Sequence, residues 1–85
     1  MFHVYVLKSE KDGKIYTGFT SNLKLRLLEH NRGLVTSTKN RRPLKLVYYE
    51  TYLGKSDAER REKYLKSGGK AKNDLKLQID DSLKT

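Results

Sequence analysis

The sequence contains no cysteine and no tryptophan, and only one proline among its 85 residues. The absence of cysteine excludes disulfide bonds, zinc sites built on thiolates and cysteine nucleophiles. Apolar residues form uninterrupted runs of at most four, such as Val4–Leu7, which are long enough for a strand and too short for a membrane span. Because no long apolar stretch follows a basic N-terminus, we expect no secretory signal and a cytoplasmic location.

Positive charge, by contrast, is abundant and concentrated in the middle of the chain. The sequence has 19 Lys and Arg against 10 Asp and Glu, which gives a formal net charge of +9. Residues 22–45 hold seven basic residues and one acidic residue, whereas residues 73–85 carry a slight negative excess. A basic patch attracts polyanions, and nucleic acid is the commonest of these. The alternative is a surface that serves only solubility.

Length and composition indicate one small domain. With 35% hydrophobic and 34% charged residues, the chain is too apolar for a disordered tail, and 85 residues are too few for two domains. We expect a single domain over residues 1–80 and a frayed C-terminal tail over residues 81–85. No segment pairs a basic face with a large apolar face, so we expect no association with a membrane.

The first half of the chain predicts a hairpin followed by a helix. Residues 2–7 and 15–19 have strand-like composition, and Asp12-Gly13 between them is a turn signal, so residues 2–19 form an antiparallel hairpin. Thr20, Ser21 or Asn22 caps a helix with Leu23, Leu27 and Leu28 on one side, which ends near Asn31 and Gly33. Residues 34–43 are polar and indicate a loop.

The second half predicts a strand and two helices. Residues 44–50 are β-prone, and Ser56-Asp57-Ala58-Glu59 matches a capping box that starts a helix ending near Lys66. Ala71, Leu75 and Ile79 recur every four residues and predict a short third helix. The order β-β-α-β-α-α gives an α+β fold in which helices pack on a small antiparallel sheet of three strands. The pattern leaves the position of the third strand in the sheet open.

The side chains available for chemistry suit phosphate better than a metal-thiolate or acyl-transfer site. The chain has no phosphate-binding glycine motif, and two histidines without cysteine are too few for a conventional zinc site. Arginine binds phosphate oxygens through two parallel N–H groups. A single carboxylate with several waters is an adequate site for Mg²⁺.

Several short motifs then follow one another in a consistent order over residues 2–66. They are His3-Val4-Tyr5, Tyr16-Thr17-Gly18, the series Thr20, Asn22, Leu23, Arg26, His30 and Asn31, the segment Arg41-Arg42-Pro43, and Ala58 with Glu62 four residues later. In this order and spacing they resemble the GIY-YIG nuclease superfamily. Within it, the chain is similar to the small stand-alone members related to the N-terminal domain of excinuclease C. The fold implied is GIY-YIG-like.

The resemblance implies a role for individual side chains. Tyr5 and Tyr16 correspond to the paired tyrosines beside the scissile phosphate, and either one is a candidate general base. Arg26 corresponds to the arginine that stabilises charge on the phosphate, and His30 to a residue that helps to orient the nucleophile. Glu62 corresponds to the carboxylate that binds a divalent cation, Mg²⁺ or Mn²⁺.

Other residues are implied to contact nucleic acid. A phosphate could approach the backbone closely at Gly18, which is unusual within a strand. Lys39, Arg41 and Arg42 are expected to contact the phosphate backbone without recognising base sequence.

Each of these side chains also has a structural alternative. Tyr5 and Tyr16 could be packing partners across the hairpin, and Arg26 could form a surface ion pair with Glu29. His30 could be an ordinary exposed residue at a helix end, and Glu62 could belong to a solvated charged helix. The order of the motifs favours the functional interpretation.

The function implied by the resemblance is metal-dependent hydrolysis of a nucleic-acid phosphodiester by an endonuclease. DNA is the first expectation for the substrate, and RNA stays open, as does a protein partner. The alternative is a DNA- or RNA-binding module that keeps the nuclease scaffold without catalysis. A third hypothesis is a subunit that acts only within a larger complex.

Overall fold

The first two strands form the hairpin that the sequence predicts. In the computed structural model, which describes residues 1–85, β1 (Phe2–Ser9) pairs antiparallel with β2 (Ile15–Thr20). In the connecting turn, the Asp12 carboxylate accepts a hydrogen bond from the Lys14 backbone N–H. Gly13 follows with a φ of +73°, a conformation that favours glycine because it has no Cβ.

The third strand pairs with the first. β3 (Leu44–Tyr52) runs antiparallel to β1, so the sheet order is β2-β1-β3 and β1 lies at its centre. This pairing resolves the one point of topology that the sequence pattern left open. The α+β class and the three-stranded antiparallel sheet are confirmed.

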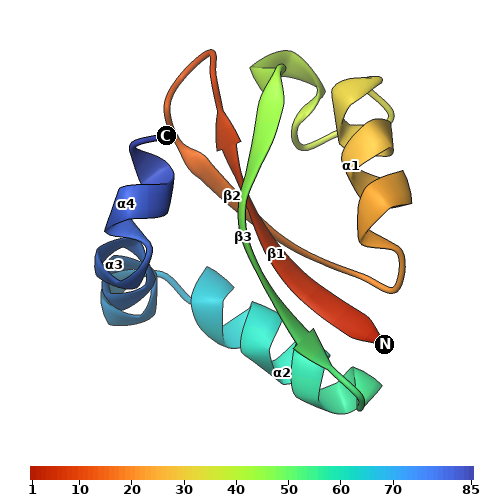
Figure 1. Ribbon diagram of the computed structural model, residues 1–85, viewed down its shortest axis with the longest axis vertical. Coiled ribbons are helices and arrows are strands. Elements are labelled where there is room, and N and C mark those ends of the chain that lie inside the picture. The colour runs from red at the N-terminus through yellow and green to blue at the C-terminus, as the bar shows by residue number, and fades with distance from the viewer.

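The central strand sends alternate side chains into two separate clusters. Val4 and Val6 pack with residues of the second and third helices on one face. Tyr5 and Leu7 point to the other face, where the first helix packs. In Figure 1, α1 lies on one side of the sheet and α3 with α4 on the other. All four of these β1 side chains are at most 1% exposed, so the strand is buried on both faces.

The first helix begins and ends where the sequence predicts. α1 (Leu23–Asn31) has Asn22 as its N-cap, and the Asn22 side chain accepts a hydrogen bond from the Leu25 N–H. Leu23 and Leu27 pack against Tyr5, Leu7 and Leu44. Leu28, expected on the same side, is instead 45% exposed. His30 takes the buried position on the helix face toward the sheet.

The end of α1 is tied directly to the start of β3. The Asn31 carboxamide donates a 2.9 Å hydrogen bond to the Leu44 carbonyl and accepts a 2.8 Å bond from the Leu44 N–H. The predicted loop between them contains one short 3-10 turn, η1 (Lys39–Arg41). These two hydrogen bonds fix the end of α1, next to His30, against the sheet.

The capping box predicted for the next helix is wrong. α2 (Lys55–Lys66) begins one residue before Ser56 and has Gly54 as its N-cap, so Ser56 already lies inside the helix and makes no cap. The Asp57 carboxylate folds back over Gly54, where an added Cβ would lie 3.1 Å from its Oδ2. The helix ends near Lys66 as predicted.

A network of polar side chains holds α2 on the sheet. Glu50 of β3 accepts hydrogen bonds from both the Nε and Nη2 atoms of Arg61, at 2.9 Å each at the closest. The hydroxyls of Tyr48 and Tyr52 donate to the same carboxylate at 2.7 and 2.6 Å. The network therefore anchors the middle of α2, the helix that also carries Glu62.

The chain closes with two helices beside the sheet. α3 (Gly69–Gln78) buries Ala71 and Leu75, with Ile79 just after it, as the four-residue spacing predicts. The segment expected to fray contains part of a one-turn helix, α4 (Asp80–Leu83), whose Leu83 packs against the core. The Lys8 ammonium donates a 2.6 Å hydrogen bond to the Leu83 carbonyl. None of the helices is long and apolar enough to cross a membrane.

Candidate active site

Three aromatic side chains from three different elements meet on the α1 face of the sheet. Tyr5 comes from β1, Tyr16 from β2 and His30 from α1. The His30 ring lies edge-on to both tyrosines, with centroid distances of 5.6 Å to Tyr5 and 5.3 Å to Tyr16. In the hairpin register Tyr16 is opposite Leu7, and Tyr5 is opposite Gly18, so the two tyrosines are not direct cross-strand partners. Their common neighbour is His30.

Gly18 is needed by this cluster because the Tyr5 ring lies across it. A Cβ at residue 18 would be 2.3 Å from both Cζ and the hydroxyl oxygen of Tyr5, far inside van der Waals contact. The sequence suggested that the missing Cβ admits a phosphate, and the structure offers a second explanation, which is that it makes room for the Tyr5 ring. The space beside Gly18 is filled by Tyr5.

His30 is fully buried, and both of its ring nitrogens are engaged. Nε2 is 2.7 Å from the Tyr5 hydroxyl, and Nδ1 is 2.7 Å from the Thr38 hydroxyl. The three groups form one continuous chain of hydrogen bonds that is complete with either tautomer of the imidazole. Thr38 is itself fully buried, immediately before η1.

The environment keeps Tyr5 and His30 uncharged near neutral pH. Burial raises the pKa of Tyr5 to about 12, although the neighbouring Arg26 guanidinium opposes the shift. Burial, together with the positive charge of Arg26, lowers the pKa of His30 to about 4. A neutral imidazole beside a protonated phenol can share a hydrogen bond with it, which holds the Tyr5 hydroxyl in place.

Arg26 and Glu62 complete the cluster from opposite sides. Arg26 lies one turn before His30 on α1, beside the Tyr5 hydroxyl, and its Nη1 is 3.2 Å from Glu29. Its side chain is 36% exposed, so the guanidinium still reaches solvent. Glu62 is close enough to Tyr5 to act on its ionisation, and its Oε2 is 3.2 Å from the Lys66 ammonium. That ammonium also lies 5.2 Å from the centre of the Tyr16 ring.

The cluster therefore contains two tyrosines, an arginine guanidinium, a neutral imidazole and one carboxylate. A model of the GIY-YIG catalytic domain matches residues 1–76 of the chain. The chain belongs to the GIY-YIG family. This family is of the nuclease type, and its catalytic domain covers nearly the whole of the present sequence.

Relatives within the GIY-YIG family are small proteins like this one. The chain is 43% identical to a UPF0213 protein of Clostridium perfringens over 83 residues, which cover 96% of this chain and 85% of that protein. It is 46% identical to a UPF0213 protein of Staphylococcus haemolyticus over 66 residues, 76% of this chain and 79% of that one. The solution NMR structure of a UPF0213 protein from Bacillus halodurans matches with a TM-score of 0.58 at 30% identity, covering 93% of this chain and 85% of that chain. The predicted relation to small stand-alone members is confirmed.

GIY-YIG nucleases generally depend on a metal ion, and the residues of this cluster fit an ion that needs few protein ligands. The chain has no group of three or more His, Asp or Glu side chains that could enclose a metal ion. Both nitrogens of His30 are engaged, so the imidazole is not a free ligand. Glu62 is the remaining candidate ligand in the cluster, and its carboxylate already pairs with a cation, the Lys66 ammonium. One carboxylate, waters and phosphate oxygens suit Mg²⁺, whereas zinc requires more protein ligands.

The three basic residues predicted to contact nucleic acid lie in different environments. Arg41 is paired with Asp12 at 3.0 Å, and this hydrogen bond lowers the pKa of Asp12 to about 2. Arg41 thus connects η1 to the hairpin turn. Lys39 and Arg42 are exposed, and the Arg42 guanidinium lies against Gly33. Contact with phosphates stays a prediction for these residues.

The sequence pattern did not reveal two residues of the cluster. Thr38 lies eight residues after His30 in a polar loop, and no sequence signal distinguishes it from its neighbours. Lys66 lies four residues after Glu62, and that spacing places two residues side by side on a helix. The helical spacing could therefore have pointed to Lys66.

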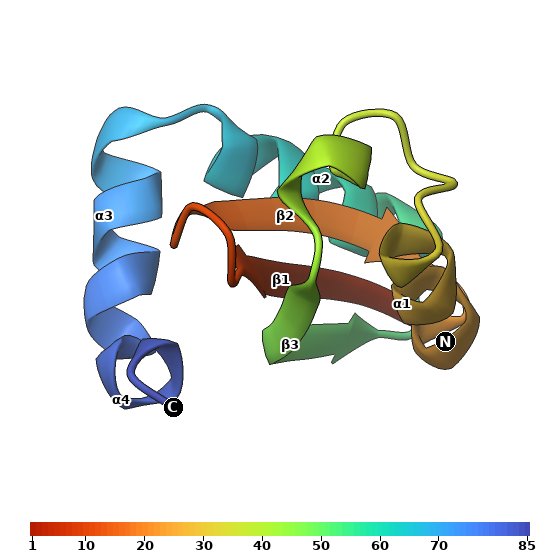
Figure 2. The same ribbon diagram turned by 90° about the horizontal axis from the view of Figure 1, so that it is seen from above.

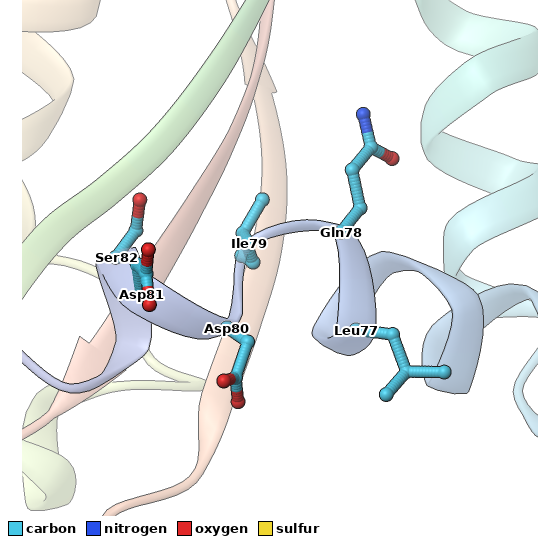
Figure 3. A pocket seen from close by; sticks show the side chains of 6 residues that line it. All are labelled: Leu77, Gln78, Ile79, Asp80, Asp81 and Ser82. Atoms are coloured by element: carbon cyan, nitrogen blue, oxygen red, sulfur yellow. The ribbon is translucent and has the colours of Figure 1, made fainter.

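A separate hollow at the junction of α3 and α4 contains none of these residues. It is lined by Leu77, Gln78, Ile79, Asp80, Asp81 and Ser82 (Figure 3). Asp80 is exposed and paired with Lys84 at 2.8 Å, and no tyrosine, histidine or arginine is present. The hollow is therefore separate from the cluster of Tyr5, Tyr16 and His30.

Proposed function

We propose that this protein is a metal-dependent endonuclease that hydrolyses a phosphodiester bond of nucleic acid, with DNA as the first substrate to test. The observation that carries the proposal is the convergence of Tyr5, Tyr16, Arg26, His30 and Glu62, which four different elements supply. Packing alone would not require a cation and a carboxylate beside two tyrosines. The alternative interpretations of these residues as isolated surface groups do not account for it.

The two tyrosines have different roles in this proposal. The Tyr5 hydroxyl is bonded to neutral His30, which orients it, and the positive charge of Arg26 favours its phenolate, the form that would take a proton from the attacking water. Tyr16 is half-buried and its hydroxyl has no hydrogen-bond partner in the structure, which leaves it free to donate to a phosphate oxygen. Positioned proton transfer of this kind contributes about 10²–10⁴-fold to a rate.

The charged residues act on the phosphate. Arg26 reaches solvent next to Tyr5 and would place its N–H groups against the charge that develops on the non-bridging oxygens. Glu62 would hold the divalent cation, which neutralises phosphate charge when bound. His30 holds the Tyr5 hydroxyl in place through their hydrogen bond.

The proposal is tested by metal-dependent cleavage of a panel of labelled DNA and RNA structures, with Mg²⁺, with Mn²⁺ and with a chelator. Arg26→Ala and Glu62→Gln should each lower the cleavage rate by about 10²-fold or more. The matched controls are Arg60→Ala and Glu59→Gln on the exposed surface of α2, which should cleave like the unaltered protein. Cleavage that persists in both Arg26→Ala and Glu62→Gln would refute the proposal.

A second candidate is a nucleic-acid-binding module without catalysis. The observation in its favour is the pairing of Glu62 with Lys66, which leaves the only carboxylate of the cluster neutralised. This candidate predicts salt-sensitive binding and no cleavage at any concentration of Mg²⁺ or Mn²⁺. Binding by the unaltered protein without any cleavage on the whole panel would favour it.

A further inference from the structure

A groove opens beside the candidate site along the edge strand. It has a volume of about 210 Å³ and is bounded by the start of β2, the end of α2 and the turn that leads into α3. Tyr16, Lys66, Gly68 and Lys72 are among the residues that line it, and no acidic residue does. Figure 2 shows α2 running alongside β2, with α3 following at the far end of both. The groove therefore begins at a tyrosine of the cluster and leads away from it.

Lys66 stands at the inner end of this groove. Its ammonium is 3.2 Å from Glu62 and 5.2 Å from the centre of the Tyr16 ring, while the side chain as a whole is 46% exposed. A solvent-exposed ion pair of this kind contributes less than about 1 kcal/mol. The ammonium can therefore leave Glu62 for a stronger partner at little cost.

Lys72 stands at the outer end, in the first turn of α3. It forms no ion pair, whereas Lys70 in the same turn is paired with Asp74 at 3.0 Å. Its ammonium is exposed and has no acidic neighbour within ion-pair distance. Because no acidic residue lines the groove, the charge of Lys72 is unpaired, and that of Lys66 becomes available when its ammonium leaves Glu62.

We propose that Lys66 and Lys72 form a phosphate-binding subsite for the nucleic-acid strand, next to the phosphate that is cleaved. The strand leaves the catalytic cluster past Tyr16 and follows the edge of β2 toward the turn before α3. The subsite rests on the proposed nuclease function, because that function brings a strand to Tyr16. Contacts of ammonium groups to phosphates position a strand without recognising its sequence.

Binding measured in the presence of a chelator tests the subsite without any need for cleavage. The variants are Lys66→Ala and Lys72→Ala, and the probe is a labelled oligonucleotide that the unaltered protein binds. The matched control is Lys63→Ala, which removes the same charge from α2 but lies with Ser56, Glu59 and Arg60 away from the groove. Affinity is measured over a series of salt concentrations.

Each groove variant should lose one phosphate contact. The slope of log K against log salt should then fall by about 0.7–0.9, and affinity should fall about fivefold to eightfold near 0.1 M salt. Lys66→Arg should restore both values, because it returns the charge. Lys63→Ala should change neither by a comparable amount. Lys72→Ala keeps the result independent of Glu62, since Lys72 has no ion-pair partner.

The outcomes separate the subsite from the nuclease function. Groove variants that bind no more weakly than Lys63→Ala, in a protein that cleaves nucleic acid, would overturn the subsite and leave the nuclease function standing. An unaltered protein that neither binds nor cleaves any member of the panel would overturn both. A loss of slope in Lys66→Ala and Lys72→Ala, with rescue by Lys66→Arg, supports the subsite.

Discussion

Gly18→Ala tests whether the packing of Tyr5 across β2 sets the geometry of the candidate site. The new Cβ would lie 2.3 Å from Cζ and from the hydroxyl oxygen of Tyr5, whereas ordinary contact begins at 3.4 Å. The ring must therefore move by about 1 Å relative to β2. Tyr5 is 1% exposed and cannot relax into solvent. A movement of this size is enough to break the 2.7 Å hydrogen bond to His30.

The cost has two parts. Forcing an extra methyl group into a packed interior typically costs about 1–3 kcal/mol. Leaving the buried Tyr5 hydroxyl or His30 Nε2 without a partner costs about 1–3 kcal/mol more. We expect the free energy of unfolding to fall by about 2–6 kcal/mol, a large part of the roughly 4–13 kcal/mol that is usual for a domain of this size. The melting temperature should fall by at least about 8 °C.

Urea unfolding of a double-mutant cycle with Tyr5→Leu provides the measurement. Without the aromatic ring, Gly18→Ala should cost nothing or stabilise the strand by up to about 1 kcal/mol, since alanine is favoured over glycine there. An equal cost in both backgrounds would refute the argument from packing. So would an unchanged stability accompanied by weaker nucleic-acid binding, because that result would return Gly18 to the role of admitting a phosphate.

Three further results follow from the same contacts. The pKa of His30 is lowered from 6.5 to about 4 in the folded protein, so the unfolded chain binds a proton at higher pH than the folded chain does. The free energy of unfolding should therefore fall by up to about 3 kcal/mol as pH drops from about 6.5 toward 4. Urea unfolding of His30→Gln, which lacks this group, should show no such fall between about pH 6.5 and 4.5. Glu50→Gln should lower the free energy of unfolding by about 1–3 kcal/mol because it breaks the bidentate contact with Arg61, whereas Glu10→Gln on the exposed turn should change it by less than about 0.5 kcal/mol, and equal values for the two would contradict the role of the network. Lys66→Ala should bind Mn²⁺ more tightly than the unaltered protein in a calorimetric titration without nucleic acid, since the ammonium no longer competes for Glu62; weaker binding would contradict that competition.

Local sequence patterns were sufficient for most of the fold. The Asp12-Gly13 turn between two β-prone segments predicted the hairpin, and Asn22 and Gly33 marked the ends of α1, because turn and cap preferences depend on a few neighbouring residues. The prediction of a capping box at Ser56 was wrong because so short a pattern does not decide where the helix begins. Gly54 offered an earlier start that the contact with Asp57 accommodates.

The candidate site was predictable as a set of residues but not as a geometry. The motif order pointed to Tyr5, Tyr16, Arg26, His30 and Glu62, and the structure places all five in one neighbourhood. It gave no indication that His30 is fully buried, since a polar residue near a helix end is more often exposed. Nor did it indicate Thr38, whose contact with His30 depends on how the loop returns to the sheet.

The sequence by itself determined the α+β class, the element order and the basic charge, because periodicity, turn residues and composition act over short distances along the chain. Only the tertiary structure decided that β1 lies between β2 and β3, and that Gly18 makes room for Tyr5. It also decided that Lys66 stands between Glu62 and a groove lined by Lys72. These features join residues that are far apart along the chain, or depend on the face that a helix turns toward the sheet, and such contacts are set by packing.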